Sequence, residues 1–171
     1  IAAIKKLGGQ ITVDESKPGK PVVSVAFRRA DVTDADLEHL KRLTSLEELD
    51  LHRQQITDAG LKNLKGLTQL RRLEIEGTQV TDAGLEHLKT LVNLRILELG
   101  GTQVTGEGFV HLKGLTNLLG LKLGSTQIDD DGVVYLEALT SLRGLDLSDT
   151  LVTDEGVKKL QEALPKCKIE H

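Results

Sequence analysis

The chain of 171 residues is poor in several residue types on which common protein functions depend. It has a single cysteine, no methionine or tryptophan, one tyrosine and two phenylalanines. One cysteine forms neither an internal disulfide nor a multi-cysteine metal site. Trp and Tyr are among the residues most enriched in binding hot spots, so their scarcity argues against tight binding of a partner.

Strong positive charge and long apolar runs are also missing. The net charge of −4 argues against broad binding of nucleic acid or anionic membranes. No stretch approaches the roughly 20 apolar residues of a membrane-spanning helix, so we expect no membrane insertion. The sequence begins at Ile1 and contains no methionine, which predicts an excised domain or a processed product of a longer protein.

A unit of 24 residues recurs along most of the chain. Its full copies are 43–66, 67–90, 91–114, 115–138 and 139–162, and a weaker copy covers 19–42. A fixed period of this length is typical of stacked arrays, in which each unit buries its apolar side against its neighbours.

Each unit predicts a strand followed by a short helix. In 91–114, Leu97 and Leu99 alternate as in a strand, whereas Phe109 and Leu112 have helical spacing. Neighbouring strands lie about 4.8 Å apart and neighbouring helices about 8–10 Å apart, so the stack must curve. The predicted fold is an α/β solenoid with a concave parallel sheet and convex helices.

The repeated pattern L-x-x-L-x-L-x-x-T-x-V/I-T-D-x-G-L-x-x-L resembles the leucine-rich repeat. It is most similar to the bacterial type with T-D-A-G-L at the helix start, found at 57–61 and 81–85, and it is similar to repeats of ribonuclease inhibitor and F-box adaptor proteins. The resemblance implies a right-handed horseshoe arc, a protein partner and no catalysis. Bacterial proteins of this type are often exported, which favours an exported or cell-envelope location.

The sequence divides into an N-terminal helix–strand cap (1–18), six repeats (19–162) and a C-terminal cap strand (163–171). We expect a helix over 1–7, a strand over 10–14 and an inward Cys167.

Five side chains occupy the helix N-cap column: Thr57, Thr81, Thr105, Asp129 and Thr153. Another column, where leucine-rich repeats often have Asn, holds Gln54, Thr78, Thr102, Thr126 and Thr150. Hydroxyls offer fewer donors than amides, so we expect a thin polar ladder between coils.

Residues that point outward from the sheet are free to bind a partner. The candidate binding residues are Arg28, Arg29, Glu48, Asp50, His52, Arg53, Arg72, Glu74, Glu76, Glu98, Lys122 and Asp146. Our hypothesis is that a partner's charges meet Asp50, Glu74 and Glu98. Its backbone would approach closely over glycines in the C-terminal half of the same face: Gly100, Gly120 and Gly124.

Several alternatives remain open. The outward charges could solvate a sheet face while the glycines serve turns, and the chain could be a structural spacer or folding module of a longer protein. We expect a monomer, with weak self-association through an apolar patch of Val110, Val134 and Tyr135 as a second possibility.

No motif predicts a catalytic, metal or cofactor site. His39, His87 and His111 share one helical column, but adjacent helices are too far apart for them to converge on one ion. The run 129–131 lacks the spacing of a calcium loop. Cys167 and His171 are close only in sequence, with no orienting third group.

Overall fold

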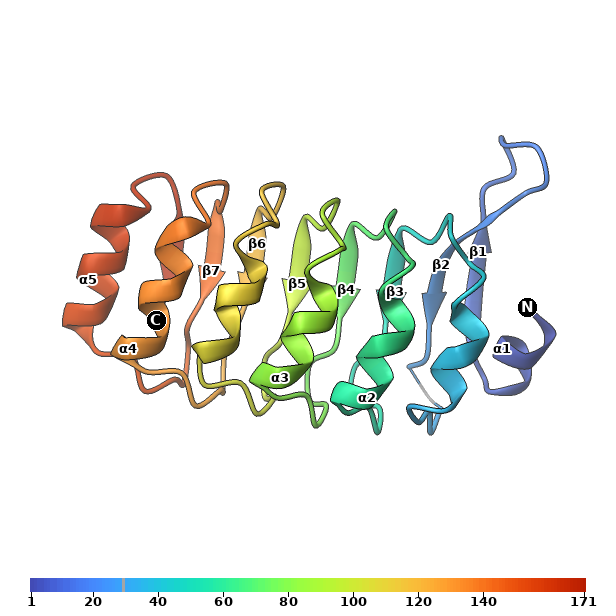
Figure 1. Cartoon of the computed structure of the whole chain (residues 1–171), viewed down its shortest axis with the longest axis horizontal. Coiled ribbons are helices and arrows are strands. Elements are labelled where there is room, and N and C mark those ends of the chain that lie inside the picture. The colour runs from blue at the N-terminus through green and yellow to red at the C-terminus, as the bar shows by residue number, and fades with distance from the viewer. Residues whose placement is uncertain (29) are drawn as a thin grey trace.

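The computed structural model describes residues 1–28 and 30–171, which form one eight-stranded sheet in sequence order. The helices cover one side of this sheet along its whole length (Figure 1). The strands are β1 (Gln10–Val13), β2 (Val22–Ala26), β3 (Glu48–Asp50), β4 (Arg72–Glu74), β5 (Ile96–Glu98), β6 (Gly120–Lys122), β7 (Gly144–Asp146) and β8 (Lys168–Glu170). Pairing is parallel from β2 to β8, and β1 joins β2 antiparallel.

The helical side combines α-helices with 3-10 turns. The α-helices are α1 (Ala2–Lys6), α2 (Asp58–Leu61), α3 (Asp82–Leu85), α4 (Asp130–Val133) and α5 (Asp154–Ala163). The 3-10 turns are η1 (Asp36–Leu40), η2 (Lys62–Leu64), η3 (Glu86–Leu88), η4 (Glu107–Leu112) and η5 (Val134–Ala138). The predicted α/β solenoid is therefore confirmed.

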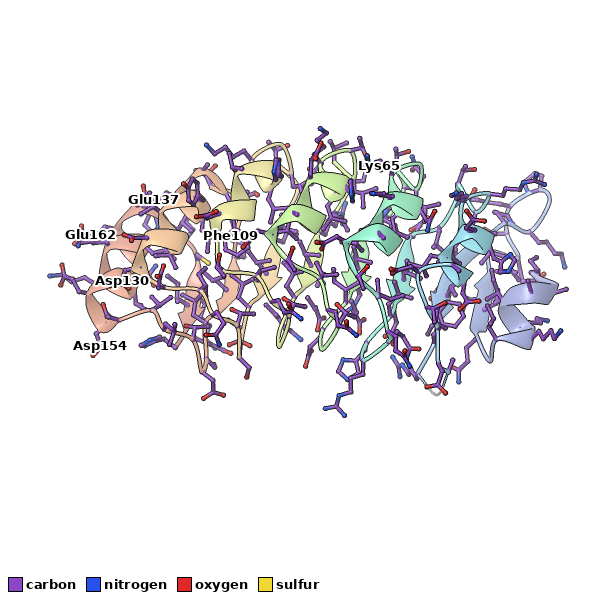
Figure 2. All side chains as sticks on the ribbon, turned by 60° about the horizontal axis from the view of Figure 1, so that its bottom comes forward. Lys65, Phe109, Asp130, Glu137, Asp154 and Glu162 are labelled. Atoms are coloured by element: carbon purple, nitrogen blue, oxygen red, sulfur yellow. The ribbon has the colours of Figure 1, made fainter. Side chains whose placement is uncertain are left out.

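One aliphatic residue from each parallel strand, a leucine on β3 to β7, forms an interior file through the stack. The strand register aligns Val25, Leu49, Leu73, Leu97, Leu121, Leu145 and Ile169 as successive partners. Leu97 is fully buried, as is Phe109 on the helical side (Figure 2). Each coil thus shares one core with its neighbours, which confirms the packing predicted from the 24-residue period.

The N-cap prediction is confirmed for four of the five coils. The side chains of Thr57, Thr81, Asp129 and Thr153 accept backbone N–H groups at the starts of their helices. For Thr105 the prediction is wrong, because η4 begins one residue later, with Gly106 as its N-cap at φ 116°. Gly106 packs so closely on Gly132 that a Cβ atom would lie 2.4 Å from the Cα of Gly132.

The aspartate after the cap column links consecutive coils, a role that the sequence did not suggest. Asp58 accepts hydrogen bonds from the N–H and hydroxyl of Thr81, at 2.8 and 2.7 Å. The same pairing joins Asp34 to Thr57, Asp82 to Thr105 and Asp130 to Thr153. Asp58, Asp82 and Asp130 also suit the positive ends of the helices that they begin.

The column of Gln54 and four threonines does not form the polar ladder between coils that the sequence predicted. Gln54 alone reaches a neighbouring coil in two ways, donating to the carbonyl of Phe27 and accepting the N–H of Val32. The threonine hydroxyls donate instead within their own coil, as Thr102 does to Leu99 O at 2.6 Å. Among the described residues, the threonines of this column make no side-chain hydrogen bond to a neighbouring coil, and backbone bonds such as that from Gln103 N–H to the carbonyl of Val80 join the coils here.

Short elements lie at both ends of the stack. At one end, α1 buries Ile4 against the core, and Gly9 packs on Ile4 and on Phe27. At the other, β8 follows α5, and Cys167 is buried as expected. The division at 18/19 and 162/163 remains a prediction. No helix among the described residues is long and apolar enough to cross a membrane.

Candidate functional site

The face of the sheet opposite the helices carries regular columns of outward side chains, and we call it the open sheet face. In the central column, register pairing aligns Ala26, Asp50, Glu74, Glu98, Lys122, Asp146 and Glu170. The preceding column aligns Ser24, Glu48, Arg72, Ile96, Gly120, Gly144 and Lys168. Seven of the twelve candidate residues are thus brought onto one surface by five neighbouring strands, β3 to β7.

An ion-pair network crosses the middle of this face. Glu98, only 4 % exposed, accepts from Arg72 Nη2 at 2.5 Å and from Lys122 Nζ at 2.9 Å. Arg72 Nε also donates to Glu74 at 2.5 Å. The hydrogen bond to Glu98 raises the pKa of Lys122. Arg72 and Lys122 therefore stay charged, and they bind the carboxylates of Glu74 and Glu98.

Asp50 is similarly occupied near the N-terminal end. It is 7 % exposed, pairs with Arg28 Nε at 2.8 Å and accepts the backbone N–H of His52 at 3.0 Å. Arg29, another predicted binding residue, lies outside the described residues. The acids that we expected to meet a partner's charges are thus largely neutralised by this chain's own cations.

The remaining predicted residues are more accessible. Glu48 and Arg53 are exposed, and Arg53 adopts a left-handed backbone at φ 57°. His52 Nδ1 lies 3.9 Å from Glu76, whose side chain is 42 % exposed. Asp146 accepts the N–H of Ser148 at 2.9 Å and is half-buried. These side chains keep polar atoms that a partner can reach.

A hollow of about 300 Å³ opens over β6 and β7; the sequence reasoning placed a partner over Gly120 but did not predict a hollow there. Gly120 and Gly144 lie in it together with Leu121 and Leu145, and Ile96 lines one end. Its charged lining residues are Arg72, Glu98, Lys122, Arg143, Asp146, Lys168 and Glu170. The available signal was the pair of glycines at equivalent strand positions, of which the sequence hypothesis used only Gly120, as a place where a partner's backbone approaches.

A second hollow of about 190 Å³ lies toward the carboxyl ends of the same strands. Lys122 and Asp146 line both hollows, and Glu76 and Asp149 add two carboxylates here. Because Lys122 is already paired with Glu98, the second hollow has a net negative lining.

The apolar patch on the helical side is exposed as its sequence column suggested. Val110 is 41 % exposed, Val134 57 % and Tyr135 37 %. Val110 belongs to η4, and the other two residues belong to η5. Self-association through this patch stays a prediction.

The residues considered for chemistry lie apart from one another. Among the described residues there is no group of three or more His, Cys, Asp or Glu side chains arranged to hold a metal ion. His87 is buried, its Nδ1 has no hydrogen-bond partner within the described structure, and burial lowers its pKa. Burial raises the pKa of the Cys167 thiol. The ring of His171 faces elsewhere, with Nε2 2.8 Å from the carbonyl of Val152.

Comparison with known proteins identifies similar sequences and folds. A family model described as Leucine Rich repeat matches residues 42–65, 114–136 and 138–160. The chain is similar to an internalin (inlF) from Listeria monocytogenes str. 4b F2365, with a TM-score of 0.67 and 28 % identity. That match covers 78 % of this chain but only 36 % of the internalin.

A second similar structure is an internalin C2 (inlC2) from the same strain. The match has a TM-score of 0.59 and 24 % identity, and it covers 98 % of this chain and 80 % of the internalin C2. At this identity the match supports a shared fold and nothing further. A search of curated proteins gave no match.

Proposed function

Because the chain is a leucine-rich repeat protein, we propose that it is a non-catalytic recognition module that binds a protein partner on its open sheet face. Leucine-rich repeat domains generally mediate protein–protein interaction. The partner in this proposal contacts the sheet, because the helices cover the sheet's other side (Figure 1).

One observation carries the proposal: three separate hollows open along the sheet face. Besides the two over β6 and β7, a hollow of about 310 Å³ lies near the N-terminal end, lined by Thr12, Asp14, Ser24 and Glu48 among others. A face with relief and accessible charge is typical of recognition surfaces, which need concave features for a partner's side chains.

The ion pairs refine how a partner would bind. Asp50, Glu74 and Glu98 already have cationic partners, so an incoming cation would have to replace contacts that exist. Their proposed role is to keep the centre of the face rigid and nearly neutral. The contacts themselves come from accessible residues such as Glu48 and Glu76.

The structural spacer remains the second candidate function. It is favoured by the regular register of the coils, which would suffice to separate two parts of a longer protein. A spacer needs no particular residues on the open sheet face, so substitutions there distinguish the two functions.

The test uses paired charge reversals. A partner is captured by cross-linking from the source cell or its surroundings, purified, and titrated calorimetrically against the wild type and against Glu48→Arg/Glu76→Arg. The control is Glu107→Arg/Glu137→Arg, which changes the same charges on the helical side, where Figure 2 labels Glu137. We expect affinity to fall at least about tenfold only in the first variant, roughly 1.4 kcal/mol. Equal affinity for all three proteins, or no specific partner, would favour the spacer.

A further inference from the structure

The glycines of the open sheet face differ in whether the fold requires them. Gly77 and Gly101 adopt left-handed backbone, at φ 67° and 61°. A Cβ atom on Gly100 would lie 3.1 Å from the carbonyl oxygen of Gly124, and one on Gly124 would lie 3.3 Å from Asp146. Backbone conformation or close packing therefore accounts for these four glycines.

Gly120 and Gly144 have no such reason. Neither has a positive φ. A Cβ atom on Gly120 would meet only Ile96 Cγ1 at 3.8 Å, which is ordinary contact, and one on Gly144 would meet nothing within 4 Å. Glycine within a strand costs about 0.5–1 kcal/mol relative to alanine. Such a residue in a strand often marks a place where a ligand or another backbone approaches closely.

The two glycines form a flat floor. They are direct partners on adjacent strands, about 4.8 Å apart, with Ile96 before them and Lys168 after them in the same column. With no side chain on either residue, the backbone of both strands is open to a planar group lying on the sheet.

The rim of the hollow favours an aromatic group. Arg143 is exposed, its Nη1 donates to the backbone carbonyls of Thr140, Ser141 and Leu142, and within the described structure it pairs with no carboxylate. A guanidinium whose charge is not neutralised attracts the face of an aromatic ring. A flat glycine floor with this cation at its edge suits a planar ring better than a branched aliphatic side chain.

The second hollow has the charge to bind a basic group of a partner. Glu76, Asp146 and Asp149 give it a negative lining, and it lies about four residues further along the strands. Four residues of extended chain span about 13 Å. A partner segment lying along β6 would therefore reach both hollows with side chains about four positions apart.

We propose that the hollow over Gly120 and Gly144 binds an aromatic side chain of the partner protein, and that the neighbouring acidic hollow binds a basic side chain of the same segment. This inference rests on the proposed recognition function and names the chemistry of the partner. The scarcity of aromatic residues in this chain fits the arrangement, because the partner supplies the ring.

The first experiment is an NMR titration of the ¹⁵N-labelled protein. The probe is a capped peptide with a tryptophan and an arginine separated by three glycine or serine residues. We expect the amide signals of Gly120 and Gly144 to shift. Replacing the tryptophan of the peptide by leucine, or its arginine by glutamate, should weaken binding about fivefold or more. Equal binding of the leucine peptide, or shifts confined to other surfaces, would overturn the proposal.

A second experiment fills the hollow. Gly144→Leu places a side chain where the structure has open space, and Gly114→Leu is the matched control, since a Cβ there also meets nothing within 4 Å. Thermal unfolding checks that both variants fold. We expect only Gly144→Leu to abolish the shift at Gly120, and unchanged binding in that variant would refute the subsite.

The same variants separate this subsite from the broader function. If the captured partner loses affinity for Glu48→Arg/Glu76→Arg but binds Gly144→Leu normally, the recognition function holds and the aromatic subsite is wrong. If neither variant affects the partner, both proposals fail.

Discussion

Replacing Asp82 by alanine should show that the aspartate column holds consecutive coils together. The carboxylate of Asp82 accepts four hydrogen bonds from the next coil. They come from the hydroxyl of Thr105 at 2.7 Å and from the N–H groups of Thr105, Gly106 and Gly108 at 3.0, 3.2 and 2.9 Å. Asp130→Ala is the matched control, because Asp130 accepts only two bonds, both from the exposed Thr153.

The expected losses differ because water replaces some of these bonds and not others. Thr105 and Thr153 are exposed, so losing their bonds should cost about 1–2 kcal/mol in either variant. Gly106 and Gly108 are buried, and an unsatisfied buried N–H costs about 1–3 kcal/mol. We therefore expect Asp82→Ala to lower the free energy of unfolding by about 3–8 kcal/mol, against about 1–2 kcal/mol for Asp130→Ala.

The assay combines urea unfolding with amide hydrogen exchange, since repeat arrays can unfold in parts. In Asp82→Ala, exchange should accelerate first at Gly106 and Gly108. Burial alone would raise the pKa of Asp82, but its hydrogen bonds outweigh burial and keep the pKa below its ordinary value. The stability that the ionised Asp82 carboxylate contributes is therefore complete above the unfolded-state pKa of about 3.9, and it is lost as pH falls toward the folded-state pKa. Equal destabilisation by the two variants, or unchanged exchange at Gly108, would refute this reasoning.

Further substitutions test the core, the open sheet face and the buried histidine. Leu97→Ala should lower the free energy of unfolding by about 2–5 kcal/mol in urea titration, and a loss below about 1 kcal/mol would mean that the leucine file is loosely packed. Gly144→Ala should raise the melting temperature, whereas Gly132→Ala should lower it, because a Cβ atom there would lie 2.5 Å from the carbonyl of Thr105; a fall in both would contradict the glycine argument. Burial lowers the pKa of His87, so the unfolded state takes up a proton first and stability falls as pH drops below about 6.5. His87→Leu should flatten unfolding free energy against pH between about 7 and 5, and an unchanged slope would rule out this histidine as the cause.

The sequence predicted those parts of the fold that repeat. Leu97 could be placed in the interior because the same residue type recurs every 24 positions, and the strand register then aligns all copies. Gly106 shows the limit of this reasoning. The period assigned Thr105 as an N-cap, but the glycine after it starts the helix one residue later.

The candidate site was predictable as a face but not as a set of contacts. The column containing Asp50 and Glu98 was assigned correctly, because side chains alternate along a strand. Their ion pairs were missed, because whether Arg72 bonds to Glu98 or points to solvent depends on side-chain conformation across strands. The open space above Gly144 could not be predicted either, because it depends on how the neighbouring strands and side chains are arranged in three dimensions.

The most direct test of the central claim is an NMR map of the surface that a purified protein partner covers on the labelled chain. The open sheet face should carry the largest amide perturbations, at Ile96, Gly120 and Gly144. Perturbations confined to the helical side, around Val134 and Tyr135, would contradict the account.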